Sequence, residues 1–168
     1  KGMELIIKPI SRKHLKSAHK IYNYYIANSY SNFEEKKTTF KEFNKNHKNI
    51  IKNKYPYLVA LYGEKVVGIA YLNKFREKSG YRFASENTIY IHKDHVNEGV
   101  GYKILKELIN SSKKNMNIKS IVAVISSIDS KGSLKIHKKL GFKKVGVLKK
   151  IGYKNKKWID SIFLQKNV

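Results

Sequence analysis

The chain has 168 residues, of which 41% are hydrophobic and 29% charged, a composition typical of a folded globular protein. Its 36 Lys and Arg residues against 12 Asp and Glu give a formal net charge of +24, which attracts polyanions. The absence of cysteine excludes disulfides, thiolate nucleophiles and cysteine-ligated zinc. The length predicts one domain over residues 1–168, in which Lys1 and Gly2 are interpreted as a cloning remnant.

The excess positive charge consists almost entirely of lysine, since Arg12, Arg76 and Arg82 are the arginines of the chain. Lysine acts as a point charge and does not form the bidentate contacts that read bases. An A/T-rich genome is an alternative explanation for this composition. No apolar run approaches the roughly 20 residues of a membrane span, so we expect a cytoplasmic protein without a membrane partner.

The first third of the chain predicts one strand and two helices. Glu4–Lys8 has the pattern of a short strand, and Ser11 is a candidate N-cap for a helix that follows it. A second helix is predicted over Thr38–Lys52, and the polar loop Ser29–Lys37 connects the two.

Three strands are predicted next, at Tyr57–Tyr62, Lys65–Asn73 and Phe83–His92, the first two forming a hairpin. A turn at Asn97–Gly101 then leads into an amphipathic helix, followed by an apolar strand at Ile118–Ile125. This strand, helix, strand unit suggests local parallel pairing.

The chain closes with a short helix at Ser133–Leu140 and strands at Phe142–Leu148 and Trp158–Gln165. The order is therefore β-α-α-β-β-β-α-β-α-β-β, which predicts a mixed α/β domain built around one sheet.

The turn between the Phe83–His92 strand and the third helix carries closely spaced glycines. Glycine lets the backbone approach a phosphate, and the free N–H groups of a helix N-terminus attract it. A glycine pair before a helix is also a common simple turn. The turn residues are Val96, Asn97, Glu98, Gly99, Val100 and Gly101.

Several motifs occur together and in order from Ile6 onward: Ile21-Tyr22-Asn23, Phe33-Glu34, Pro56-Tyr57-Leu58-Val59-Ala60, Val67-Gly68-Ile69-Ala70-Tyr71, Phe75-Arg76, Tyr81-Arg82, Glu86-Asn87-Thr88-Ile89-Tyr90-Ile91, Gly99-x-Gly101, Ser133-x-x-x-His137-x-x-x-Gly141-Phe142, Lys154 and Trp158-x-Asp160. With these motifs the chain resembles the GNAT superfamily of N-acetyltransferases, in its phosphinothricin acetyltransferase-like branch. The resemblance implies a mostly antiparallel central sheet flanked by helices, acetyl-CoA as cosubstrate, a small-molecule amine as acceptor and a homodimer. It also implies direct attack of the amine on the thioester in a ternary complex.

The resemblance assigns the catalytic roles to Glu86 and His137. Glu86 is the expected general base that deprotonates the incoming ammonium group, directly or through water. His137 is expected to protonate the leaving thiolate or to orient a water beside the base. The alternatives are a strand-surface glutamate without a task and a packed helix histidine.

The residues assigned to acetyl-CoA are Ile89, Tyr90, Ile91, Val96, Asn97, Glu98, Gly99, Val100, Gly101 and Ser130. The strand residues act through backbone N–H groups that pair with the pantetheine arm and stabilise the oxyanion. Three positions depart from the family pattern. Val96 replaces Arg or Gln, Glu98 adds a negative charge beside the pyrophosphate, and Ser130 replaces an Asn, which puts the strength of cofactor binding in question.

The resemblance places Phe33, Arg76, Tyr81 and Thr88 around the acceptor amine. An arginine facing a small carboxylate suits an amino-acid-like acceptor such as phosphinothricin, methionine sulfoximine or methionine sulfone. A solvated loop arginine is the alternative.

Three other functions compete with this interpretation. A metal site at His92, Asp94, His95 and Glu98 lacks a recognisable further ligand, so no metal is expected. A nucleic-acid-binding module is motivated by the charge, but the aromatic residues fall at core-like spacing. The third alternative is an acetyltransferase whose acceptor is a protein or peptide amine. Since residues 131–157 hold 11 lysines and no acidic residue, the charge excess suits steering of a phosphate-rich cofactor, and nucleic acid is not needed to explain it.

Overall fold

The computed structural model describes residues 3–115 and 117–168, so the expected remnant at residues 1–2 lies outside the described residues. The strands are β1 (Leu5–Pro9), β2 (Tyr57–Tyr62), β3 (Lys65–Lys74), β4 (Ala84–Ile91), β5 (Ser120–Ser126), β6 (Lys143–Lys154) and β7 (Lys157–Asn167). The helices are α1 (Leu15–Asn28), α2 (Phe40–Lys52), α3 (Val100–Lys113) and α4 (Lys131–Lys139), with short 3-10 turns at Arg12–His14, Ser79–Tyr81 and Lys93–His95.

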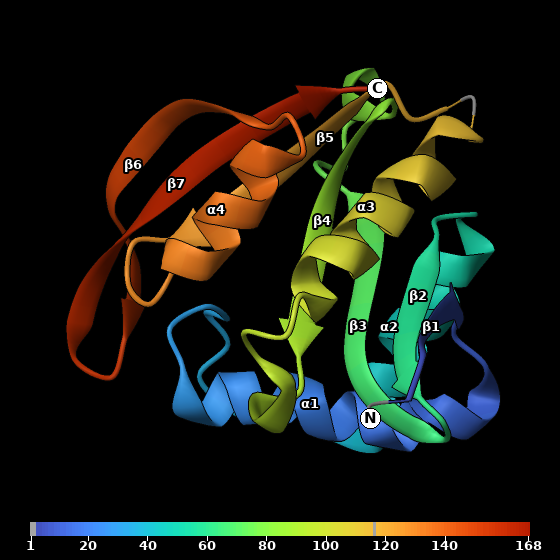
Figure 1. Ribbon diagram of the computed structural model, residues 1–168. Coiled ribbons are helices and arrows are strands. Elements are labelled where there is room, and N and C mark those ends of the chain that lie inside the picture. The colour runs from blue at the N-terminus through green and yellow to red at the C-terminus, as the bar shows by residue number, and fades with distance from the viewer. Residues whose placement is uncertain (1–2, 116) are drawn as a thin grey trace.

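All strands of the described chain belong to one seven-stranded sheet, in the order β1-β2-β3-β4-β5-β7-β6 (Figure 1). Every neighbouring pair in this described sheet is antiparallel except β4 and β5, which are parallel. The predicted mixed, mostly antiparallel α/β fold is confirmed, including the parallel pairing across α3.

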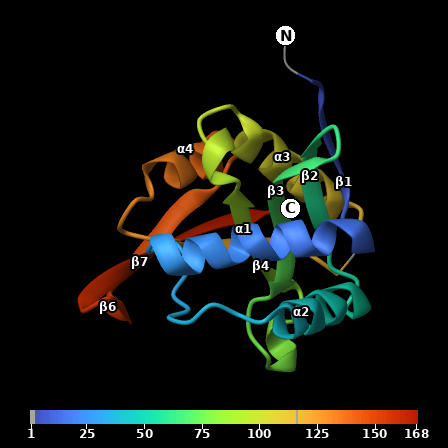
Figure 2. The same ribbon diagram turned by 90° about the horizontal axis from the view of Figure 1, so that it is seen from below.

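Helices cover both faces of the sheet, with α1 and α2 on one side and α3 and α4 on the other (Figures 1 and 2). Side chains alternate along β2, so Tyr57, Val59 and Leu61 pack toward α1 and α2, while Leu58 and Ala60 join the α3 side. This two-sided burial explains why β2 is apolar at every position.

Side-chain hydrogen bonds at the N-termini of α1 and α2 explain where these helices begin. Thr39 and Glu42 form a capping box at the start of α2, with Glu42 N donating to Thr39 Oγ1 at 3.1 Å and Thr39 N donating to Glu42 Oε1 at 2.8 Å. Ser11 is an N-cap as expected, but of the 3-10 turn that leads directly into α1. Ser11 precedes a 3-10 turn and hydrogen-bonds His14 Nδ1, and α1 begins only at Leu15.

The last hairpin is longer than predicted, because β6 continues to Lys154 and β7 to Asn167. The pairing of β6 with β7 shifts between Leu148 and Gly152, and this bulge interrupts the alternation that marks a strand in sequence. Asp160 on β7 stabilises the bulge, since its Oδ1 accepts a 2.8 Å hydrogen bond from the backbone N–H of Lys150.

The parallel pair β4 and β5 is joined over a short stretch, Ala84–Glu86 against Ser120–Val122. Beyond Glu86 the two strands separate (Figure 1), while β4 stays paired with β3 and β5 stays paired with β7. The sheet is therefore split along the rest of β4, and this opening positions the site. Within the described residues no helix is both long and apolar enough to cross a membrane.

Candidate active site

A cavity of about 490 Å³ lies in the opening between β4 and β5. The residues that line it are Tyr22, Ser31, Asn32, Phe33, Glu34, Tyr71, Glu86, Asn87, Thr88, Ile89, Tyr90, Ala123, Val124, Ile125, Ser126, Ile128, Asp129, Ser130, Ser133, His137 and Ser161. They come from α1 and the loop after it, from four strands, and from α4 with the loop before it.

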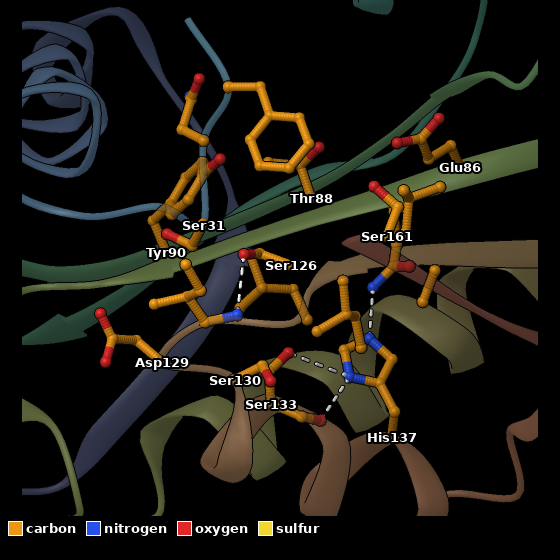
Figure 3. A pocket seen from close by; sticks show the side chains of 18 of the residues that line it. Ser31, Glu86, Thr88, Tyr90, Ser126, Asp129, Ser130, Ser133, His137 and Ser161 are labelled. Carbon is orange, nitrogen blue, oxygen red and sulfur yellow. Dashed lines mark hydrogen bonds between the residues drawn. The ribbon is translucent and has the colours of Figure 1, made fainter. Parts of the chain in front are cut away.

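Successive side chains of β4 point to opposite faces of the sheet and so to opposite sides of this cavity. Glu86, Thr88 and Tyr90 share the α1 face, where Tyr90 stacks on Tyr25 with ring centroids 5.1 Å apart. Asn87 faces α4, where it contacts His137. Figure 3 shows Glu86, Thr88 and Tyr90 across the cavity from Ser130, Ser133 and His137.

Glu86 is the ionisable group best suited to accept a proton in this cavity. Burial raises the pKa of its carboxyl above the ordinary value, and the positive charge of Arg76 opposes this shift. A carboxylate with a raised pKa is a stronger base.

Three tyrosines, Tyr22, Tyr71 and Tyr90, line the α1 side of the cavity next to Glu86. Burial raises the pKa of all three hydroxyls, so they remain protonated at neutral pH. They therefore offer hydrogen-bond donors beside the carboxylate.

His137 is buried on the opposite side, 3% exposed, and both ring nitrogens have protein partners. Nδ1 lies 2.7 Å from the carbonyl oxygen of Ser133, and Nε2 lies 2.9 Å from Nδ2 of Asn87. Burial lowers the pKa of His137, and the bond to Ser133 opposes that shift more weakly. The ring is therefore neutral at pH 7.

The turn before α3 has the backbone needed to approach an anion. Asn97 and Gly99 have φ of 62° and 82°, in the left-handed region, and Gly99 is the N-cap of α3. A Cβ on Gly101 would lie 3.3 Å from Cδ1 of Ile136, so this glycine keeps α3 close to α4. The N-terminal N–H groups of α3, which have no partner within a helix, fit a phosphate.

Glu98, whose negative charge departs from the family pattern, is hydrogen-bonded to His95. Its carboxylate accepts a 3.0 Å hydrogen bond from Nδ1 of His95, so its charge is partly engaged within the turn. Val96 is exposed, and Ser130 lies at the start of α4 and lines the cavity.

Two of the four predicted acceptor residues, Phe33 and Thr88, line the cavity. The other two lie on the loop between β3 and β4 and are not among the described residues that line it. There the Arg76 guanidinium lies over the Phe75 ring at 5.4 Å, and Tyr81 packs against the same ring at 5.9 Å.

The tertiary structure also assigns a role to Lys154, which the sequence placed in a motif without a task. Its side chain is buried, and Nζ donates to the carbonyl oxygens of Ser29 at 2.9 Å and Asn32 at 2.6 Å. A Cβ on Gly152 would clash with the Phe33 ring, which packs directly on this glycine. The β6–β7 hairpin thus holds the loop after α1 against the cavity.

Among residues 3–115 and 117–168, no group of three or more His, Cys, Asp and Glu side chains is arranged to hold a metal ion. The cavity instead combines a carboxylate, hydroxyl donors and a strand backbone that β5 does not pair. Together with the helix N-terminus that follows the glycine turn, a site of this kind suits an acyltransferase with a phosphate-bearing acyl donor.

The family described as "Acetyltransferase (GNAT) domain" matches residues 7–163. The chain belongs to this family of acetyl-CoA-dependent acetyltransferases. It is 32% identical over 146 residues to a phosphinothricin N-acetyltransferase of Alcaligenes faecalis, covering 87% of this chain and 74% of that protein. It is also 32% identical over 111 residues to an L-methionine sulfoximine/L-methionine sulfone acetyltransferase of Salmonella typhimurium, covering 66% of this chain and 64% of that protein.

Two solved structures share the fold closely. A phosphinothricin acetyltransferase of Sinorhizobium meliloti in complex with acetyl-CoA has a TM-score of 0.92 and 30% identity, covering 99% of this chain and 89% of that chain. A ribosomal-protein-alanine N-acetyltransferase of Brucella melitensis has a TM-score of 0.93 and 28% identity, covering 97% and 99%.

The contacts of Lys154 predict that Lys154→Met loosens the loop after α1. The methionine keeps the aliphatic stem but leaves the Ser29 and Asn32 carbonyls unpaired, so the free energy of unfolding should fall by about 1–3 kcal/mol. Hydrogen exchange should also become faster in residues 29–37. Lys143→Met, at an exposed position of β6, is the matched control and should change neither quantity. Equal exchange in both variants would contradict the role of Lys154.

Proposed function

We propose that this acetyltransferase transfers the acetyl group of acetyl-CoA to the amine of a small amino-acid-like acceptor of the phosphinothricin, methionine sulfoximine or methionine sulfone type. The observation that carries the proposal is the position of Glu86, a half-buried carboxylate on the α1 face of a cavity that crosses the sheet. The named activities of the relatives support the acceptor class.

The charge of the cavity supports an amine acceptor. Its described lining includes the acidic residues Glu34, Glu86 and Asp129 and neither lysine nor arginine, although the whole chain carries a net charge of +24. A site of this sign attracts a protonated amine more strongly than the surrounding surface does.

In the proposed reaction, bound acetyl-CoA supplies the acetyl group as a thioester. Glu86 takes the proton of the ammonium group, directly or through a water, which frees the nitrogen lone pair. The C–N bond forms, the C–S bond breaks, and the acetylated amine and the coenzyme A thiol are the products. Thr88 and the three tyrosine hydroxyls face the acceptor side and can orient it.

We assign the α3 and α4 side to acetyl-CoA. The backbone of Ile89, Tyr90 and Ile91, which β5 does not pair, can bond the pantetheine arm and the developing oxyanion. The N–H groups from Asn97 to Gly101 can hold the pyrophosphate, and Ser130 can add a hydroxyl contact.

The roles proposed for His137 and Arg76 require these side chains to leave their observed positions. Proton donation by His137 stays a prediction, because in the observed arrangement Asn87 bonds Nε2 and Ser133 bonds Nδ1. Arg76 lies close enough to influence the pKa of Glu86, and a swing of its loop toward the cavity would bring the guanidinium to an acceptor carboxylate.

The acceptor class is tested by release of free thiol from acetyl-CoA in the presence of different amines. The panel comprises phosphinothricin, methionine sulfoximine, methionine sulfone, free methionine and alanine-initiated peptides. We expect kcat/KM at least tenfold higher for the glutamate-like and methionine-derived compounds than for the peptides. The reverse order would favour a peptide acceptor, the activity named for the Brucella neighbour.

Glu86→Gln is expected to lower kcat about a hundredfold or more, because the amide cannot accept the proton. Acetyl-CoA should bind the variant as tightly as it binds the wild type, measured by calorimetry. Glu77→Gln is the matched control, since Glu77 is exposed on the β3–β4 loop and pairs with Lys74. Turnover unchanged by Glu86→Gln would remove Glu86 from the role of base.

The pH profile provides a second measure of the same group. The wild-type kcat/KM should rise as pH increases through the pKa of Glu86, since only the carboxylate accepts a proton. Burial raises that pKa, so this limb should lie above the ordinary glutamate value of 4.5. The limb should be absent from Glu86→Gln.

We also propose a homodimer formed through β6, in the cytoplasm, where acetyl-CoA is available. β6 is an edge strand, and apolar side chains stand exposed along it and its hairpin partner, including Leu148, Ile151 and Trp158. An exposed apolar edge strand is a site where a second chain can pair and bury the apolar side chains.

Ile151→Glu should convert the dimer to a monomer in sedimentation velocity, because the charge would be buried at the interface. Ile51→Glu, on α2 and similarly exposed, should remain dimeric. A wild-type chain that sediments as a monomer at micromolar concentration would contradict the proposed interface.

A further inference from the structure

The amide of Asn87 has an unsatisfied polar atom inside the cavity. Asn87 is 8% exposed, and within the described part of the chain its Oδ1 has no hydrogen-bond partner. A buried carbonyl oxygen without a donor costs free energy, so such atoms in folded proteins usually have a protein, water or ligand partner.

His137 determines which way this amide points. The 2.7 Å contact between Nδ1 and the carbonyl oxygen of Ser133 requires a proton on Nδ1, since a carbonyl only accepts. Nε2 of the neutral ring is therefore an acceptor, and it takes its hydrogen bond from Nδ2 of Asn87 at 2.9 Å. The opposite amide orientation would set Oδ1 against the Nε2 lone pair. The packing of His137 against Phe142, with ring centroids 4.9 Å apart, holds the imidazole in place.

The position of Asn87 on β4 indicates what its free oxygen can meet. It is the first residue of β4 beyond the stretch paired with β5, and it faces α4, the side assigned to acetyl-CoA. Glu86 and the acceptor lie on the other face of the strand. The pantetheine arm contains two amide N–H groups, which are the donors that a carbonyl oxygen needs.

We propose that Asn87 Oδ1 accepts a hydrogen bond from an amide N–H of the pantetheine arm, and that His137 is a positioning residue that orients the Asn87 amide for this contact. The inference rests on the proposed use of this cavity by acetyl-CoA. The buried Oδ1, the amide that His137 holds in one orientation and the β4 backbone that β5 does not pair lie together. They form a binding point for the pantetheine arm close to the reacting thioester.

The test compares two ligands by isothermal titration calorimetry: acetyl-CoA, and 3′-phosphoadenosine 5′-diphosphate, the part of coenzyme A without the pantetheine arm. Asn87→Leu keeps the side-chain size and removes the acceptor. We expect its dissociation constant for acetyl-CoA to rise about tenfold or more and that for the nucleotide to stay within about twofold.

Other results would overturn the inference. Asn87→Leu that binds acetyl-CoA within twofold of wild type would show that the oxygen has no ligand partner. An equal loss for both ligands would indicate a structural role only. A wild-type protein that binds the nucleotide but not acetyl-CoA would contradict the proposed function itself, and the inference with it.

The orientation by His137 has its own readout. His137→Phe removes the acceptor that holds Nδ2, so the amide can turn and its oxygen is no longer directed at the arm. We expect weaker acetyl-CoA binding, by about threefold or more, with unchanged nucleotide binding, and a double variant that binds acetyl-CoA no more weakly than Asn87→Leu alone. Additive losses in the double variant would contradict the positioning role.

Discussion

The separation of β4 from β5 is the constraint on which the rest of this structure depends. The two strands pair in parallel at Ala84–Glu86 and then diverge, because β5 continues along β7 while β4 continues along β3. A sheet that stayed closed would satisfy the β4 backbone with β5 and would leave no passage between its faces. The divergence produces both an unpaired strand backbone and a cavity that crosses the sheet.

Side-chain alternation along β4 then divides the chemistry between the two sides. Glu86 and Thr88 share the face of α1 and its tyrosines, where an amine can lose its proton, while Asn87 turns to His137 on the face of α4. Neighbouring residues thus face opposite sides of the cavity. The same burial that raises the pKa of Glu86 lowers that of His137, so the carboxylate becomes a stronger base and the imidazole stays neutral.

Sequence patterns predicted most of the elements and part of the site. Strands β2 and β3, the α3 helix and its glycine turn were predicted within a few residues, because burial on both faces and helical spacing leave strong local signals. The end of β6 was not predicted, because a bulge stabilised by Asp160 interrupts the alternation of side chains that marks a strand. Arg76 and Tyr81 were expected at the acceptor, yet both pack on Phe75 outside the cavity. A motif specifies residue types but not the loop conformation that aims them.

By itself the sequence determined the family and the order of elements, because these follow from residue types at fixed spacing along one chain. The tertiary structure decided what depends on contacts between distant segments. It showed that Lys154 holds the loop after α1 and that His137 engages Asn87, 50 residues away along the chain. Hydrogen bonds of this kind require particular distances and orientations between groups, and no local pattern in a sequence records them.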